Sequence, residues 1–256
     1  MLKKLKSVLE SPRGLLSLLV LKAILFLVLL VFLGRNSIWL AGFFLIVLYL
    51  YFRDSLNVED FLSSFLILLS GSLIAIRIPA QDNFWFAVGV ATFFAILFFV
   101  LMGIKNLIFI HRTVPYYFLN SLLFSVVFIL FFYFDKSNFF AFKYLLSGLA
   151  ILFLFREFLD FNRESIPNPI QSSVLAKKNL LALALAFLTL EFMWVVSLLP
   201  IGFLNSASSL LLFILVLDDL LLHLWSGTIN RHVVLRNTTI FLLINVLIFM
   251  FSRWTL

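Results

Sequence analysis

Residues 179–199 read NLLALALAFLTLEFMWVVSLL, and residues 207–226 read ASSLLLFILVLDDLLLHLWS. Each stretch is mostly apolar and about 20 residues long, which is the length that an α-helix needs to cross about 30 Å of hydrocarbon. A short turn at 200–206 separates them. The two stretches therefore predict neighbouring antiparallel transmembrane helices, interrupted by four ionisable residues: Glu191, Asp218, Asp219 and His223.

The composition of the whole chain agrees with this prediction. Of 256 residues, 64% are hydrophobic and only 12% are charged, whereas soluble domains carry about 25% charged residues. So much apolar surface requires lipid rather than water as the surrounding phase. The apolar runs do not alternate with polar residues, so they favour helices over the strands of a membrane barrel. Because the chain has no cysteine, disulfides and thiolate metal sites are excluded.

The same pattern continues on both sides of this pair. Nine spans are predicted, near 14–34, 37–52, 61–78, 84–104, 115–134, 139–155, 179–199, 207–226 and 237–252. Several are short, so eight or nine transmembrane helices are expected. No polar block is long enough for a soluble domain, and the first apolar run is too long for a cleaved signal peptide. The prediction is an all-α, polytopic helical membrane protein, with residues 1–256 forming a single transmembrane helical domain.

The basic residues predict how the chain is oriented. With the N-terminus in the cytoplasm, thirteen of the nineteen Lys and Arg residues fall in cytoplasmic segments and four in outer segments. The other two, Lys22 and Lys143, fall within spans. Because cytoplasmic loops carry an excess of Lys and Arg, the N-terminus is expected in the cytoplasm and the C-terminus outside. Thin loops without a soluble domain favour a prokaryotic cytoplasmic membrane.

The acidic residues within the spans are the main candidates for a functional site. An Asp at the centre of a transmembrane helix costs roughly 2.5–3.5 kcal/mol on insertion scales, so it usually has a partner, a proton or a function. We expect a buried polar centre of six residues: Glu191, Asp218, Asp219, His223, Lys22 and Asn245. Lys22 and Asn245 lie at depths where either could pair with a carboxylate. Glu191 and Asp218 lie at similar depths, but the sequence leaves open whether they meet.

Three interpretations of this centre remain open. The acids can be protonated or paired, and so hold helices together. They can form a proton or cation relay. They can also belong to an active site, because Asp219 and His223, four residues apart, offer an acid–base pair or half of a metal site. No complete metal site and no cofactor are predicted.

A second candidate site lies on the predicted cytoplasmic face. Arg156, Arg163 and Arg231 could contact a lipid headgroup or a phosphate, since guanidinium groups suit phosphate oxygens. The alternative is that these residues only provide the positive charge that fixes topology. Common enzyme motifs such as the Walker A sequence and H-E-x-x-H are absent, so an enzyme is not favoured.

These observations leave three function classes. The leading one is a membrane component that binds or moves a small or lipid-like ligand, or that assembles with partners, through the acidic centre. The alternatives are an interfacial enzyme acting on a lipid or lipid-linked substrate, and a scaffold subunit without chemistry. Membrane lipids and other membrane proteins are the expected partners. Nucleic acid is not expected, because the net charge of +7 is dispersed between apolar runs.

Overall fold

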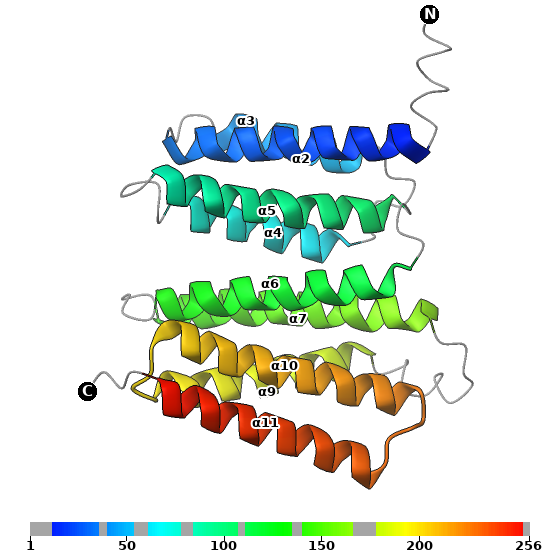
Figure 1. Ribbon diagram of the computed structural model, residues 1–256, viewed down its shortest axis with the longest axis vertical. Helices are drawn as coiled ribbons and strands as arrows, with labels where there is room; N and C mark the ends of the chain where they lie inside the picture. Colours follow the sequence, from blue (N-terminus) through cyan, green and yellow to red (C-terminus); the bar gives the residue numbers. More distant parts are fainter. Residues whose placement is uncertain are drawn as a thin grey trace, which may run out of the picture. The chain divides into compact units, whose positions relative to one another are not determined.

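The computed structural model describes residues 12–35, 40–53, 61–77, 84–106, 111–134, 140–165 and 178–252 (Figure 1). Within these residues the fold is helical throughout, with nine helices and no strand. They are α2 (Pro12–Arg35), α3 (Leu40–Phe52), α4 (Leu62–Arg77), α5 (Phe84–Lys105), α6 (Thr113–Tyr133), α7 (Phe140–Ser165), α9 (Lys178–Ser197), α10 (Phe203–Trp225) and α11 (Arg231–Phe251).

Six of these helices are long and apolar enough to cross a membrane: α2, α5, α6, α9, α10 and α11. Two more apolar helices, α3 and α4, have 13 and 16 residues, which at 1.5 Å per residue is shorter than the hydrocarbon layer. The prediction of an all-α polytopic membrane protein is confirmed. The number of crossings and the cytoplasmic N-terminus stay predictions.

The chain divides into two compact units, Met1–Leu119 and Asn120–Leu256. Unit 1 contains α2 to α5, unit 2 contains α7 to α11, and α6 runs across the division. Each unit is described by itself. That residues 1–256 form a single domain therefore stays a prediction.

Unit 1 is built around α2 and α5, which pack against each other and against the shorter helices. Phe26 of α2 stacks on Phe98 of α5 with ring centroids 4.7 Å apart, and Phe43 of α3 lies 5.8 Å from Phe26. All three rings are buried. Aromatic contacts of this kind help to fix how apolar helices pack where water does not drive them together.

Lys22 has a structural position in unit 1. Its ammonium group donates to the Leu50 carbonyl oxygen over 3.3 Å, and Lys105 donates to the next carbonyl, that of Tyr51, over 3.2 Å. Both carbonyls lie in the last turn of α3, where the helix has no internal donors left for them. Two cations from neighbouring helices thus satisfy the C-terminal end of α3.

Unit 2 is held together by contacts of α7 with α9 and of α10 with both α9 and α11. Three rings join the last three helices: Phe213 of α10 lies 4.6 Å from Phe192 of α9 and 6.0 Å from Phe241 of α11. On the other side of α9, a Cβ atom at Gly148 of α7 would lie only 2.9 Å from Cδ1 of Leu190. The absence of a side chain at position 148 therefore allows α7 and α9 to approach closely.

Most helix boundaries agree with the predicted spans, but α7 ends at Ser165, ten residues after the predicted end at 155, and α11 begins at Arg231, six residues before the predicted start at 237. The last span was placed by hydropathy, which excludes the polar segment 230–236. That segment is nevertheless helical because Asn230 caps it: its Oδ1 accepts a hydrogen bond from the Val233 N–H over 2.9 Å. The end of α10 and the start of α11 are thus a helical, polar region of unit 2.

Candidate functional site

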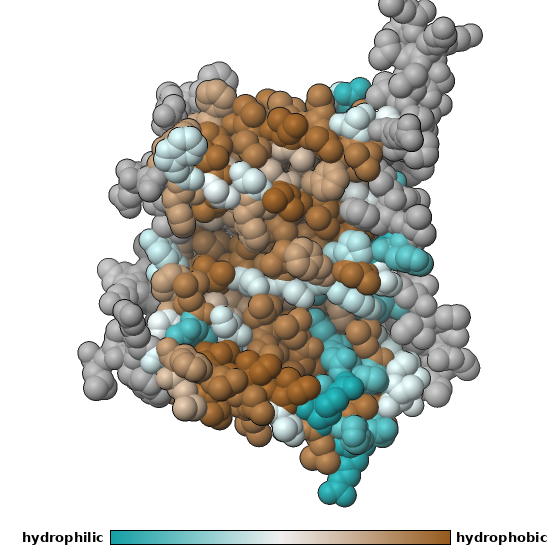
Figure 2. Space-filling view, in the orientation of Figure 1, coloured by the Kyte–Doolittle hydropathy of each residue, from teal (hydrophilic) through white to brown (hydrophobic). Residues whose placement is uncertain are grey.

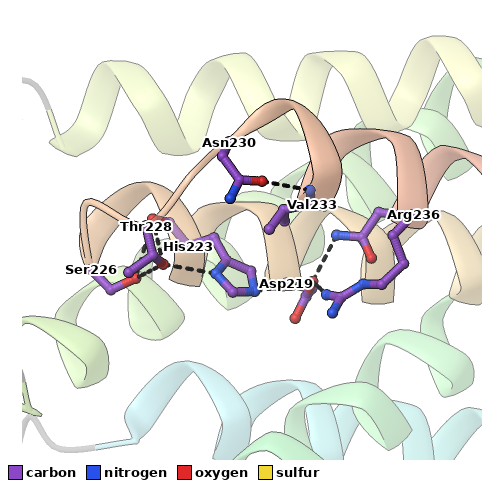
Figure 3. Close-up of polar contacts among 8 residues, drawn as sticks. Asp219, His223, Ser226, Thr228, Asn230, Val233 and Arg236 are labelled. Carbon is purple, nitrogen blue, oxygen red and sulfur yellow. Dashed lines mark hydrogen bonds and ion pairs between the residues drawn. The ribbon is translucent and has the colours of Figure 1, made fainter.

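The main polar site of unit 2 lies where α10 ends and α11 begins (Figure 3). The end of α10 is fixed by Gly227, whose φ is +67°, a value that glycine adopts without steric cost. The Gly227 N–H donates to the Leu224 carbonyl over 3.2 Å, and the Thr228 N–H donates to the His223 carbonyl over 3.0 Å. This pair of bonds is the Schellman motif, and it places the Thr228 side chain beside the His223 ring.

Asp219 is the centre of the side-chain contacts at this site. Its Oδ2 accepts from Asn237 Nδ2 over 2.7 Å and from Arg236 Nη2 over 3.1 Å, both on α11. His223 Nε2 lies 3.8 Å from the same oxygen, too far for a hydrogen bond. The Asp219 side chain is 41% exposed, so this carboxylate is at the surface of the unit and already paired with a cation.

A second set of contacts surrounds the other nitrogen of the imidazole ring. His223 Nδ1 lies 2.8 Å from Thr228 Oγ1, which in turn lies 2.6 Å from Ser226 Oγ. Carboxylate, imidazole and hydroxyl therefore follow one another as they do in a nucleophilic site. The series is interrupted, however, at the 3.8 Å gap between His223 and Asp219.

The surroundings of this site are hydrophilic and basic. Figure 2 shows hydrophilic surface gathered where α10 meets α11, next to apolar surface. Arg231, His232 and Arg236, all in the first two turns of α11, are exposed. Leu235, Leu242 and Val246 are also exposed and continue the Arg231 face along the helix. We call the group of side chains at this end, namely Asp219, His223, Ser226, Thr228, Arg231, Arg236 and Asn237, the polar end.

Away from the polar end, two further polar contacts join α10 to α11. Ser209 donates to Asn245 Oδ1, and Asn205 Nδ2 donates to Ser252 Oγ over 3.0 Å. Together with the Asp219 contacts they form a polar seam along the two helices. Asn245 was predicted as a partner for a carboxylate, but its amide is bonded to Ser209 and to the Phe241 carbonyl.

Asp218 faces the interior of unit 2. It is buried, and its Oδ1 has no hydrogen-bond partner among the described residues. It shares a helix face with Trp225, seven residues on, whose ring stacks on Phe158 of α7 at 6.3 Å. Asp218 and Asp219, adjacent in the chain, thus point to different neighbours.

Glu191 does not join the other acids. It is exposed on α9 and makes no hydrogen bond or ion pair within the described part of the chain. The contact between Phe192 and Phe213 aligns α9 with α10, and Asp218 lies five residues beyond Phe213, about 8 Å further along the axis. A buried position was predicted for Glu191, but this residue lies on the exposed face of α9.

The remaining predicted residues are Lys22, Arg156 and Arg163. Lys22 belongs to unit 1 and is bonded there, whereas the acids belong to unit 2. Arg156 is exposed on α7. Asp160, four residues later, is paired with Lys178 of α9 rather than with Arg156. Arg163 lies in the last turns of α7, and its side chain is outside the described residues.

Four residues of the polar end were not predicted from the sequence: Ser226, Thr228, Arg236 and Asn237. A signal for the last was present, because Asn237 and Asn245 are eight residues apart and so share one helix face. Arg236 is one of the thirteen basic residues that the sequence assigns to cytoplasmic segments. Across the described ranges, no group of three or more His, Cys, Asp or Glu residues is arranged to hold a metal ion.

Comparisons with protein families, with curated proteins and with solved structures give no match for this chain. The chain is therefore identified only by its class, that of multi-pass helical membrane proteins.

Proposed function

We propose that the protein is a membrane component that binds a lipid-like ligand with an anionic head group at the polar end of α10 and α11. The observation that carries this proposal is the exposed trio Arg231, His232 and Arg236 at the start of α11. Asp219 holds Arg236 at 3.1 Å, which orients one guanidinium group before a ligand arrives. Arg presents a planar fork of donors that matches phosphate oxygens.

The position of this trio supports a lipid-like ligand rather than a free anion. The N-terminal end of a helix carries partial positive charge, which adds to that of the arginines. Along the exposed face of α11 that Arg231 begins, Leu235, Leu242 and Val246 are apolar, with Thr238 between them. A head group at Arg231 and an acyl chain along this face would use both features. We further propose a prokaryotic cytoplasmic membrane as the location, with lipids as partners.

The interfacial enzyme is the weaker alternative. It would use the Thr228 hydroxyl as nucleophile and His223 as base. Asp219 is engaged by Arg236 and Asn237, and lies 3.8 Å from the imidazole. Thr228 and Ser226 also belong to the structure that ends α10. These contacts favour binding over nucleophilic chemistry. A scaffold subunit is supported by the polar seam, which is structural.

The test compares lipid binding by the wild type and by Arg231→Gln/Arg236→Gln. Native mass spectrometry from neutral maltoside micelles would count adducts of phosphatidylglycerol, with phosphatidylethanolamine as the second lipid. We expect the double variant to bind phosphatidylglycerol about tenfold more weakly, since two charge-assisted contacts are lost. Arg53→Gln, an exposed arginine of unit 1, is the matched control and should bind as the wild type does.

Inorganic phosphate distinguishes the sources of the anion. If inorganic phosphate displaces phosphatidylglycerol with an affinity equal to that of the lipid, the ligand is a free anion. The acyl chain then contributes nothing to the binding free energy. Equal binding by the double variant and the wild type would show that the basic residues only determine topology. Hydrolysis of either lipid, lost in Thr228→Val, would favour the enzyme.

A further inference from the structure

Glu191 of α9 is an exposed acid that lies outside both the polar end and the polar seam. It lies six residues before Ser197, the last residue of α9, which places it about 9 Å inside that end of the helix. Its exposed neighbours on α9, Phe187, Trp194 and Val195, are apolar. A carboxylate in such surroundings needs a proton or a cation to offset the cost of removing it from water.

The surface next to Glu191 is hollowed. A shallow, open hollow of about 280 Å³ is lined by Tyr144 of α7 and by Leu190, Glu191 and Trp194 of α9. Two aromatic residues therefore line this hollow together with Glu191. Because Gly148 lets Leu190 approach α7 closely, the hollow lies between two helices whose contact is tight. The hydroxyl of Tyr144 lies 3.3 Å from Ser197 Oγ, and this contact ties the Tyr144 wall to α9.

The cations of unit 2 that the structure describes near this hollow have other contacts. Lys143, the neighbour of Tyr144, is buried, with its ammonium 4.4 Å from the centre of the Phe131 ring and 5.7 Å from the centre of the Tyr144 ring. Lys178, at the start of α9, is paired with Asp160. Within the described residues, no Lys or Arg forms a salt bridge with Glu191.

We propose that the hollow formed by Tyr144, Leu190, Glu191 and Trp194 binds the head of an amphiphilic ammonium cation that enters from the bilayer. The carboxylate supplies the opposite charge. The faces of Tyr and Trp rings attract ammonium groups, and aromatic surroundings of this kind are used to recognise quaternary ammonium ligands. The apolar face of α9 would contact the tail of the ligand. This site is independent of the polar end, which would take an anion.

The experiment uses the full-length protein in neutral maltoside micelles, with dodecyltrimethylammonium as the probe and native mass spectrometry as the readout. The competitor is an uncharged dodecyl amphiphile whose head is a hydroxyl group. We expect one saturable adduct on the wild type. Glu191→Gln, which keeps the volume but removes the charge, should weaken this binding about tenfold or more. The uncharged amphiphile should not compete.

Two further variants separate the roles of charge and ring. Glu157→Gln removes an equal charge from α7 and should leave the affinity unchanged. Trp194→Leu should weaken binding about threefold to tenfold, and Trp194→Phe should restore part of it because the aromatic face returns. Helical content by circular dichroism confirms that each variant folds.

The proposal is overturned if no saturable adduct forms, if Glu191→Gln binds as the wild type does, or if the uncharged amphiphile competes equally. It is also overturned if the protein does not bind the probe but binds a transmembrane peptide bearing one lysine, and if Glu191→Gln abolishes the binding of that peptide. That result would show that the face is a docking surface for a partner helix.

Discussion

Asp218 and Asp219 show that the contribution of an aspartate to stability depends on its surroundings. Asp219 is half-exposed and bonded to Arg236 and Asn237, whereas Asp218 is buried with an oxygen that has no partner among the described residues. A buried polar atom without a hydrogen bond costs free energy, while a satisfied one contributes a modest gain. Asp218 should therefore lower the stability of the protein, and Asp219, the next residue in the chain, should raise it.

Replacing each aspartate by valine tests this difference. Asp218→Val removes an unsatisfied buried group and should raise the free energy of unfolding by about 1–3 kcal/mol. Asp219→Val breaks two hydrogen bonds and leaves Arg236 unpaired, so it should lower that free energy by about 1 kcal/mol. Reversible unfolding in mixed micelles containing dodecyl sulfate measures both. Equal destabilisation by the two substitutions would mean that Asp218 has a stabilising partner.

At the scale of elements, α10 and α11 are joined by polar contacts at three levels. Asn205 meets Ser252, Ser209 meets Asn245, and Asp219 meets Asn237. Few residues of α11 are buried, and two of its three buried residues are asparagines. In lipid there is no hydrophobic driving force that brings helices together. Hydrogen bonds and close packing therefore determine where α11 packs against α10.

A double-mutant cycle on Ser209→Ala and Asn245→Leu measures one of these contacts. The expected coupling is about 0.6–1.7 kcal/mol, the range found for hydrogen bonds between transmembrane helices. Leu243→Ala, on the exposed face of α11, is the control and should change stability by less than about 0.5 kcal/mol. A coupling near zero would mean that α11 is held by packing alone.

At the scale of the whole molecule, the distribution of basic residues predicts that the N-terminus is cytoplasmic. The turns before and after α10 lie at opposite ends of a 23-residue helix, which is about 34 Å long and so long enough to cross the bilayer. The turn before α10 is predicted outside, and the basic polar end after it inside.

The chain has no natural cysteine, so single cysteines report topology directly. Leu198→Cys lies before α10 and Ile229→Cys after it, both at exposed positions. In intact cells, a membrane-impermeant maleimide should label position 198, and it should reach position 229 only after permeabilisation. The reverse pattern would invert the predicted orientation. Labelling of both positions from one side would show that α10 does not cross.

The sequence by itself determined the helical membrane class and most helix boundaries, because the length and apolar composition of a span follow directly from the thickness of hydrocarbon. It failed at the start of α11, since hydropathy does not detect a capped polar turn such as Asn230–Val233. It also placed Glu191, Asp218, Lys22 and Asn245 in one centre. Depth along a helix can be counted from the sequence, but the direction in which a side chain points depends on which helices pack around it.

Only the tertiary structure decided those directions. It put Lys22 on the end of α3, Asn245 on Ser209, Asp218 in the interior and Glu191 on the outside. It also brought Arg236 and Asn237 to Asp219, across 17 and 18 residues of chain. The physical reason is that a polar group in hydrocarbon bonds to whatever partner packing brings within reach.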